Sequence, residues 1–229
     1  MKKGKIHKVS TDKIFQQKDK PRILFKYQSI NDYSLSNLKE GKLWSSYPES
    51  FNDPFEYKHK VIGEPGNTEW DELYKSENRL TVVCLTEVPD DLLMWSHYGD
   101  SHYGFCMGFE ITKLTTKVNY SNDYPTLDFT KNKNQQILSW YSIVHSKSEH
   151  WNYEKEHRMI FIGPESLREY PGLFTTIIFG VKTKDSDKQK IREILKDKVN
   201  YFQAELDGSF YKINIYESEI NLKLAEEDK

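Results

Sequence analysis

The fold is decided first by the stretch ILFKYQSINDYSLSNLKEGKLWSSYP, residues 23–48. It opens with the apolar and aromatic run Ile23–Tyr27, which is typical of a β-strand. A helical pattern follows, because Asp32 or Ser34 can cap a short helix and Gly41 can end it in a left-handed conformation. A second run of strand type comes next, up to a proline. The chain therefore opens as strand, short helix and strand.

The rest of the chain mixes short strand patterns with a few helical ones. Apolar and aromatic runs predict further strands at residues 42–47, 81–86, 104–111, 117–120, 157–162, 175–181, 201–206 and 210–216. Helical spacing predicts further helices at residues 68–78, 90–95 and 134–144, and another from residue 186. Strands and helices do not alternate regularly, so we expect an α+β fold rather than a doubly wound parallel sheet.

Three local patterns predict how some of these elements end and which faces they bury. Ser186 and Gln189 have the spacing of a capping box at a helix start. The pair Asp207-Gly208 is a signal for a two-residue hairpin turn. Ile137 and Val144 lie on one predicted helix face, together with the aromatic pair between them, and we expect that face to be buried.

The composition is that of a folded protein with a polar surface. The length of 229 residues corresponds to about 1.5 average domains. We expect one domain at residues 21–220, after a loose N-terminal arm at 1–20 and before a charged tail at 221–229. The net charge of −2 and the pI of 6.4 exclude a strongly basic nucleic-acid coat protein and an acidic tail protein.

The sequence also predicts a compartment. It contains no apolar run of about 18 residues, so we expect no membrane span. The lysine-rich N-terminus has no apolar stretch behind it, unlike a secretory signal. Cys84 and Cys106 are the only cysteines, which is too few for a disulfide framework. We therefore expect a reduced, cytoplasmic setting.

The residue types that bind metals do not have a ligand spacing. His97 and His102 are five residues apart, whereas two ligands on one helix face are four apart. Cys84 and Cys106 have no zinc-site spacing and lie in apolar strand patterns, so we expect them to be inert core residues. A nucleophile pair of Cys106 with a histidine stays open. No metal is predicted.

The run Glu154-Lys155-Glu156 is a candidate for chemistry. If it is a strand, both carboxylates point to the same side and could face one pocket. Two carboxylates in one place repel each other, and they persist where a cation or a substrate hydroxyl uses them. The alternative is a solvated charge run that pairs with Lys155 and Arg158.

Several motifs, in their order along the chain, resemble a bacterial family of unknown function, family 2971. The most specific ones are Asn-Asp-Pro-Phe-Glu at residues 52–56 and Met-Trp-Ser-His-Tyr at residues 94–98. Lys147 with Trp-Asn-Tyr-Glu-Lys-Glu-His-Arg at residues 151–158 completes the pattern. The resemblance extends over residues 24–216. It implies no activity, but it marks a set of motif residues: Asn52, Asp53, Glu56, Lys147, Trp151 and Arg158.

A more distant similarity does imply an activity. The opening strand, helix, glycine and strand are similar to those of ADP-ribosyltransferases, including the toxin branch that modifies nucleic acids. This similarity implies one domain with a bent, split, mixed β-sheet and peripheral helices, and it implies NAD as the substrate. Glu156 would then stabilise the positive charge that develops on the ribose as nicotinamide leaves. Glu154 would orient or deprotonate the acceptor.

The same similarity implies that Lys26 or Tyr27 on the first strand and Ser45 and Tyr47 on the second bind NAD. Trp95, His97 and Tyr98 are further candidates to line the NAD pocket, although no motif assigns them. The acceptor would be a nucleic acid or a protein, or water if the enzyme is an NAD glycohydrolase. Bacterial enzymes of this kind usually act as toxins or phage-defence effectors, so an antitoxin or a defence-system partner is expected.

Two other functions remain open. The first is a metal-dependent nuclease, in which Asp53, Glu56 and Lys58 would bind Mg²⁺ and a phosphate. The second is a nucleotide-binding module without catalysis, in which Trp44, Trp95 or Tyr98 would stack on a base. The near-neutral net charge argues against broad nucleic-acid binding, because contacts to phosphates need a basic surface.

Overall fold

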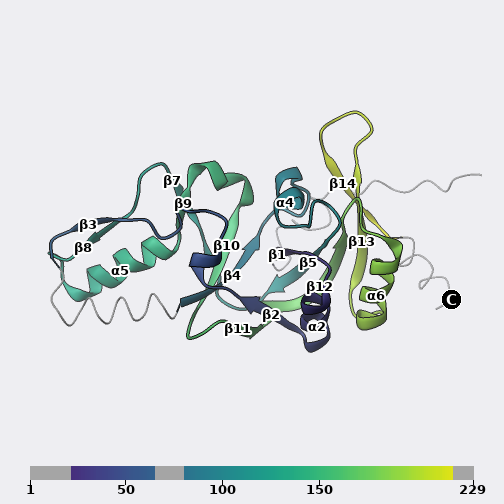
Figure 1. Ribbon diagram of the computed structural model, residues 1–229, viewed down its shortest axis with the longest axis horizontal. Helices are drawn as coiled ribbons and strands as arrows, with labels where there is room; N and C mark the ends of the chain where they lie inside the picture. Colours follow the sequence, from purple (N-terminus) through teal and green to yellow (C-terminus); the bar gives the residue numbers. More distant parts are fainter. Residues whose placement is uncertain (1–21, 65–79, 219–229) are drawn as a thin grey trace, which may run out of the picture. The chain divides into compact units, whose positions relative to one another are not determined.

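The structure is a computed structural model that describes residues 22–64 and 80–218, and these form two compact units (Figure 1). Unit 1 contains the described parts of residues 1–42, 86–113 and 169–229, and unit 2 those of residues 43–85 and 114–168. Both units contain helices and strands, so the mixed α and β class is confirmed. The arrangement typical of ADP-ribosyltransferases stays a prediction, as does the single domain at 21–220.

Unit 1 is built on a sheet with the strand order β14-β13-β12-β5-β1. The strands are β1 (Ile23–Gln28), β5 (Phe105–Ile111), β12 (Gly172–Phe179), β13 (Asn200–Leu206) and β14 (Ile213–Glu217). Neighbouring strands are antiparallel except β12 and β13, which are parallel and are connected through helix α6 (Asp185–Leu195). The sheet is therefore mostly antiparallel, as expected for a chain without regular β-α-β alternation.

The helices of unit 1 begin close to the predicted caps, but not at them. Helix α2 (Asp32–Glu40) is capped by Asn31, whose side chain accepts a hydrogen bond from the Ser34 backbone N–H. Gly41 ends it with a φ of 70°, as predicted. Helix α4 (Leu92–His97) is capped by Asp91 instead of Asp90. These shifts of one residue arise because neighbouring Asn and Asp side chains are all able to cap.

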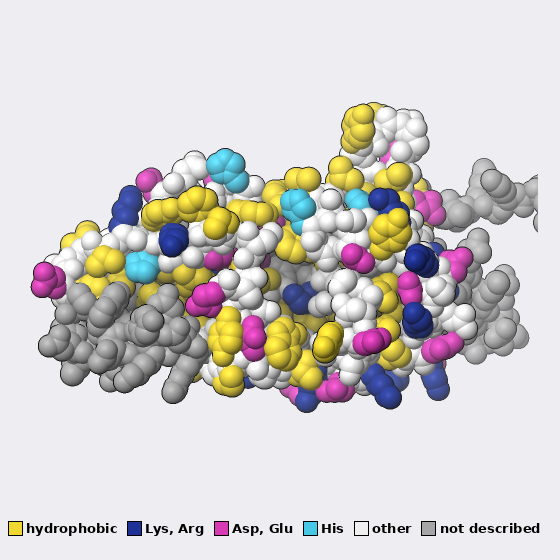
Figure 2. All heavy atoms as spheres, viewed as in Figure 1, with side chains coloured by type: hydrophobic (Ala, Val, Ile, Leu, Met, Phe, Trp, Pro, Cys, Tyr) yellow, Lys and Arg dark blue, Asp and Glu magenta, His cyan; other side chains and the backbone are white. Residues whose placement is uncertain are grey.

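Two further predictions for unit 1 are wrong. Helix α6 begins at Asp185 and has no side-chain cap, so Ser186 and Gln189 form no capping box. The hairpin between β13 and β14 has a loop at residues 207–212 instead of a two-residue turn, because Asp207 accepts hydrogen bonds from the N–H groups two and three residues on. The tip of this hairpin projects in Figure 1 and carries exposed hydrophobic side chains in Figure 2.

Unit 2 consists of short strands around a small apolar core. Its strands are β2 (Lys42–Ser45), β3 (Lys60–Ile62), β4 (Leu80–Thr86), β6 (Thr116–Lys117), β7 (Asn119–Ser121), β8 (Thr126–Asp128), β9 (Ser146–Ser148), β10 (Glu156–Ile162) and β11 (Ser166–Glu169). Strands β4, β10 and β6 are consecutive in one sheet, β2 pairs with β11, and β3 with β8 and β7 with β9 form parallel pairs. Two 3-10 helices, η1 (Pro48–Ser50) and η2 (Glu149–Glu154), lie next to the predicted motifs.

Helix α5 (Lys133–Val144) packs against this core with part of the predicted face. Val144 is buried and Trp140 packs against the core, but Ile137 and Tyr141 are 55% and 48% exposed. Gln136 is buried as well, and its side-chain amide donates hydrogen bonds to the carbonyl oxygens of Phe129 and Lys131. Those bonds satisfy a polar group that would otherwise be costly to bury.

Some predictions fall on parts of the chain outside the described residues. They are the helix at 68–78, the arm at 1–20 and the tail from 221 onward. Within residues 22–64 and 80–218, no helix has both the length and the apolar character needed to cross a membrane.

Candidate functional site

The motif Asn-Asp-Pro-Phe-Glu forms a tight turn that directs one carboxylate into unit 2. Asp53 accepts a hydrogen bond from the backbone N–H of Phe55 at 2.9 Å, and its carbonyl accepts one from the N–H of Glu56 at 3.2 Å. Tyr57 follows in a left-handed conformation with a φ of 61°. The carboxylate of Asp53 is therefore engaged in a hydrogen bond within the turn. The side chain of Glu56 is only 4% exposed.

Glu154 and Glu156 are brought together by a change of backbone direction instead of by one strand. Glu154 ends helix η2, Lys155 adopts a left-handed conformation with a φ of 43°, and Glu156 begins strand β10. The expectation of an extended Glu-Lys-Glu run is therefore wrong. The alternative of a solvated charge run is also wrong, because Glu154 and Glu156 are 3% and 4% exposed.

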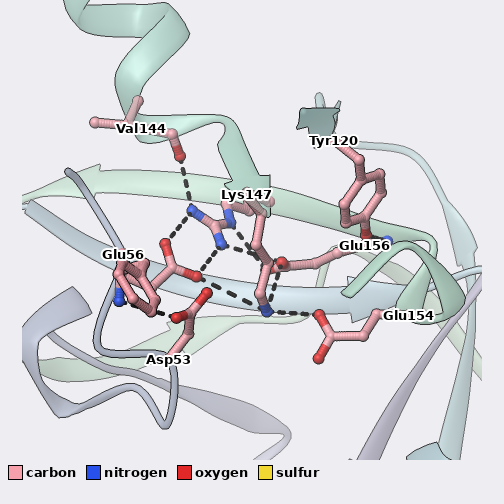
Figure 3. A network of polar contacts seen from close by, with 9 residues as sticks. Asp53, Glu56, Tyr120, Val144, Lys147, Glu154 and Glu156 are labelled. Atoms are coloured by element: carbon pink, nitrogen blue, oxygen red, sulfur yellow. Dashed lines mark hydrogen bonds and ion pairs between the residues drawn. The ribbon is translucent and has the colours of Figure 1, made fainter. Parts of the chain in front are cut away.

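Lys147 lies at the centre of these carboxylates (Figure 3). Its Nζ is 2.6 Å from Glu154 Oε2, 3.6 Å from Glu156 Oε2 and 3.8 Å from Glu56 Oε1. Burial would lower the pKa of Lys147, but Glu156, Glu154 and Glu56 together raise it above the ordinary value. The amine is therefore a fixed ammonium group, and it is not suited to act as a nucleophile or a base.

Arg158 binds two of the three carboxylates that surround Lys147. Its guanidinium binds Glu156 through Nε at 2.9 Å and Nη2 at 3.0 Å, and Glu56 through Nη2 at 2.7 Å and Nη1 at 3.1 Å. Nη1 also donates to the carbonyl oxygen of Val144 at 2.9 Å. Arg158 is 1% exposed. Two-pronged contacts of this kind hold both carboxylates in a fixed geometry.

We call Glu56, Lys147, Glu154, Glu156 and Arg158 the charge cluster. Burial would raise the pKa of Glu156, but Arg158 and Lys147 lower it to about 2. Burial raises the pKa of Glu56 in spite of the same two cations. Three carboxylates face two cations, so the cluster has one negative charge in excess when all five groups are ionised. Of Glu56 and Glu156, Glu56 gains a proton more readily.

Two pockets of unit 2 lie next to the charge cluster. The first, which we call the acidic pocket, has a volume of about 450 Å³ and is lined by Glu49, Phe51, Asp53, Glu56, Tyr57 and Lys58, among others. The second, which we call the serine pocket, has a volume of about 290 Å³ and is lined by Lys58, Ser121, Ser146, Lys147, Ser148 and His150, among others. Lys58 lines both pockets, and Lys147 in the second forms an ion pair with Glu56 in the first.

The other predicted residues of unit 2 have structural contacts. Ser45 is buried, donates a hydrogen bond to the Ser166 carbonyl and accepts one from Arg168. The backbone N–H of Tyr47 donates to Glu165. Ser45 and Tyr47 are not among the residues that line the two pockets. Asn52 is exposed.

The aromatic ring of Trp151 contacts the charge cluster at Lys147. Its ring lies 4.8 Å from Lys147 Nζ, which is within the range of a cation–π contact. The ring centroids of Trp151 and Tyr153 are 6.0 Å apart. The motif residues Trp151 and Lys147 thus stabilise one another.

The remaining predicted NAD-binding residues belong to unit 1. Tyr27 is buried, its hydroxyl donates to the Val88 carbonyl at 2.8 Å, and its ring meets Trp95 edge-on at 4.9 Å. Trp95 is fully buried and donates from Nε1 to the Pro89 carbonyl. These two rings therefore pack the core of unit 1. The last three residues of the set are Lys26, which is half-buried on β1, and His97 and Tyr98, whose rings meet edge-on at 6.1 Å.

Within the part of the chain that the structure describes, no three His, Cys, Asp or Glu side chains are placed to hold a metal ion. Of the residues proposed for a nuclease, Asp53 accepts hydrogen bonds within its turn and Glu56 binds Arg158. Cys84 and Cys106 are not in a disulfide bond. Burial raises the pKa of Cys106, and Cys84 hydrogen-bonds to Glu156.

Sequence reasoning named Lys58 and Lys147 but missed the serines of the serine pocket. Ser121 and Ser148 end the parallel strands β7 and β9 and are register partners, although they are 27 positions apart in the chain. Three-residue strands give almost no periodic signal, so the pairing was not visible. The signal in the sequence that could have indicated this pocket is the pair of serines that flank Lys147, Ser146 and Ser148.

Comparison with known families agrees with part of the sequence interpretation. Residues 94–159 match the family described as Protein of unknown function (DUF2971). The matched part contains the Met-Trp-Ser-His-Tyr motif and four of the five residues of the charge cluster. No curated protein and no solved structure matches the chain. The resemblance to ADP-ribosyltransferases thus receives no support from these comparisons and stays a prediction.

Proposed function

We propose that the protein consumes NAD, releasing nicotinamide and transferring ADP-ribose to a nucleic acid, a protein or water. One observation supports the proposal most: the charge cluster is buried, has an excess of negative charge and borders an open pocket through Glu56. The nicotinamide ring of NAD is cationic, and the ribose gains positive charge as the ring leaves. A negative group in a site shielded from water stabilises such a charge.

The acidic pocket has the chemistry for the nicotinamide half of NAD. Glu49 and Glu56 supply negative charge, and Phe51 and Tyr57 supply aromatic rings. A cationic ring is attracted to both kinds of group. Glu56 is the cluster carboxylate that lines this pocket, so in this proposal Glu56 contacts the developing cation.

Glu154 and Glu156 have a different part in the proposal from the one that the resemblance implied. All three carboxylates bind the cations of the cluster, but Glu56 lines the acidic pocket, whereas Glu154 and Glu156 do not. In this proposal Glu154 and Glu156 therefore act as positioning residues, which fix the two cations and, through them, the orientation of Glu56. Their catalytic contact with NAD, as implied by the resemblance, stays a prediction that the same experiment tests.

The test is an NAD turnover assay with purified full-length protein. NAD labelled on its adenylate phosphate is incubated alone and with RNA, DNA or cell lysate, and both nicotinamide release and label transfer are followed. Release without transfer indicates a glycohydrolase, and label on one acceptor class names the target. The absence of release under all these conditions contradicts the proposal.

Matched variants separate the roles. Glu56→Gln keeps the shape of the side chain and removes its charge, so we expect release to be abolished. Glu64→Gln changes an exposed carboxylate of unit 2 that lines neither pocket and serves as the control, with release retained. Loss of release in Glu156→Gln with full activity in Glu56→Gln would return the catalytic role to Glu156.

The biological setting follows from the chemistry. An enzyme that drains NAD or modifies nucleic acid stops growth, so the proposal includes a role as a bacterial toxin or phage-defence effector, held in check by an antitoxin or a defence-system partner. Expression of the wild-type chain should then arrest growth, and expression of Glu56→Gln should not. Equal growth with both chains would contradict this role.

A further inference from the structure

The serine pocket has a polar lining of a distinct kind. It is formed where the parallel strands β7 and β9 end, so that Ser121 and Ser148 lie side by side, with Ser146 two residues before Ser148. Ser121 and Ser148 thus place two hydroxyl groups at one edge of a two-stranded sheet, whereas the Ser146 hydroxyl donates to the Ser142 carbonyl at 2.7 Å. Hydroxyl groups are able to donate hydrogen bonds to an anion, and their hydrogens rotate to suit it.

Basic side chains complete this lining. Lys147 contributes only the 5% of its side chain that is exposed, because its ammonium group is held by the three carboxylates of the charge cluster. Lys58 lines the same pocket on an exposed side chain, and the His150 ring hydrogen-bonds to Ser148 at 3.1 Å. The one carboxylate in the lining, Asp123, is highly exposed and lies 3.5 Å from Lys60.

Two aromatic rings lie at the same pocket. Phe55 and Tyr124 belong to its lining and are 55% and 44% exposed. Exposed rings next to cationic and hydroxyl groups are typical of sites that hold a base and its phosphates, because each base can stack on a ring. Stacking is independent of the base sequence and adds to the attraction between ammonium groups and phosphate oxygens.

We propose that the serine pocket binds the phosphate groups of a nucleotide. The ammonium group of Lys58 contacts the phosphate oxygens, the hydroxyls of Ser121 and Ser148 donate hydrogen bonds, and Phe55 or Tyr124 stacks on the base. The phosphate site rests on its own lining; only the identification of NAD as the natural ligand rests on the proposed function.

The shared position of Lys58 explains why a dinucleotide suits this arrangement. A diphosphate in the serine pocket reaches Lys58, which also lines the acidic pocket. One half of the ligand then remains near Phe55 and Tyr124, and the other half extends toward Glu56. Anionic and cationic parts of one ligand, as in NAD, meet pockets of opposite character.

The experiment is a calorimetric titration of the full-length protein with pyrophosphate, ADP and NAD. The variant Lys58→Met removes an ammonium group that lines the pocket, and we expect pyrophosphate affinity to fall by about tenfold or more. Lys133→Met is the matched control, since it removes an exposed lysine of unit 2 that is not part of the pocket lining. We expect Lys133→Met to bind as the wild type does.

The outcomes separate this site from the proposed function. Pyrophosphate binding that Lys58→Met weakens, without any turnover of NAD, would support the site and contradict the function. NAD turnover that pyrophosphate does not inhibit would contradict the site and support the function. No binding of pyrophosphate, ADP or NAD to a folded protein, or equal losses in Lys58→Met and Lys133→Met, would overturn the proposal of a phosphate site.

Discussion

Substitution of Arg158 by methionine should destabilise unit 2 strongly, because it leaves two buried carboxylates without their main partner. The guanidinium makes five hydrogen bonds, two to Glu156, two to Glu56 and one to a backbone carbonyl. Methionine is apolar and retains much of the side-chain bulk, so the change mainly removes charge and hydrogen bonding. A buried pair that loses one partner costs about 3–5 kcal/mol of unfolding free energy.

The pKa of Glu156 gives an independent magnitude. It is lowered from an ordinary value of 4.5 to about 2 by Arg158 and Lys147 against the effect of burial. A difference of this size corresponds to about 3 kcal/mol. A loss of about 3 kcal/mol should lower the melting temperature of a chain of this length by about 6–12 °C.

The pH dependence has a definite sign. Because the pKa of Glu156 is lower in the folded than in the unfolded protein, its contribution to stability is present above pH 4.5 and is lost as the pH falls toward 2. In Arg158→Met most of this contribution is already missing at pH 7. The difference in stability between wild type and variant should therefore be large at pH 7 and smaller at pH 3.

Urea unfolding at both pH values, followed by circular dichroism, measures this difference. Arg168→Met is the matched control, because the guanidinium of Arg168 donates hydrogen bonds to two hydroxyls and a backbone carbonyl. Its cost should be smaller and nearly independent of pH. A cost below about 1 kcal/mol for Arg158→Met at pH 7, or equal costs at both pH values, would refute the reasoning.

Three other substitutions give further tests. Glu154→Gln removes the carboxylate that is 2.6 Å from Lys147 and with it the excess negative charge, so calorimetry should find pyrophosphate bound several-fold more tightly; weaker binding would count against the electrostatic account. Gly104→Ala places a Cβ 2.1 Å from the Gln28 carbonyl oxygen, and thermal unfolding should show a severe loss of stability or no folded protein. In Gly41→Ala the new Cβ meets no atom within 4 Å, so only the backbone strain at a φ of 70° lowers the unfolding free energy, by about 1 kcal/mol. Similar melting temperatures for the two alanine variants would contradict the packing argument.

The sequence was most informative where local chemistry sets the structure. The strand at Ile23–Gln28 and the helix end at Gly41 could be predicted, because an apolar run and a glycine with a left-handed conformation act within a few residues. Caps were predicted within one residue, since Asn31 and Asp91 compete with neighbours of the same chemistry. The hairpin loop after β13 was predicted too short, because the Asp207 side chain organises a longer loop.

The candidate site could be predicted only in its composition. Its glutamates, lysine and arginine were singled out from their motifs, but Glu56 and Arg158 are 102 positions apart and no local pattern pairs them. The convergence of Glu154 and Glu156 depends on the left-handed backbone at Lys155, a residue without a preference for that conformation. The burial of the charge cluster likewise depends on long-range packing, and so it appeared only in the structure.

The most direct test of the account is nicotinamide release from NAD by the wild type and by Glu56→Gln, measured side by side on protein whose folding is checked by circular dichroism. We predict release by the wild type, loss of release in Glu56→Gln and retention in Glu64→Gln. A folded wild-type protein that releases no nicotinamide, with or without nucleic acid and lysate, would contradict the proposed function. Undiminished release in Glu56→Gln would contradict the role of the charge cluster in it.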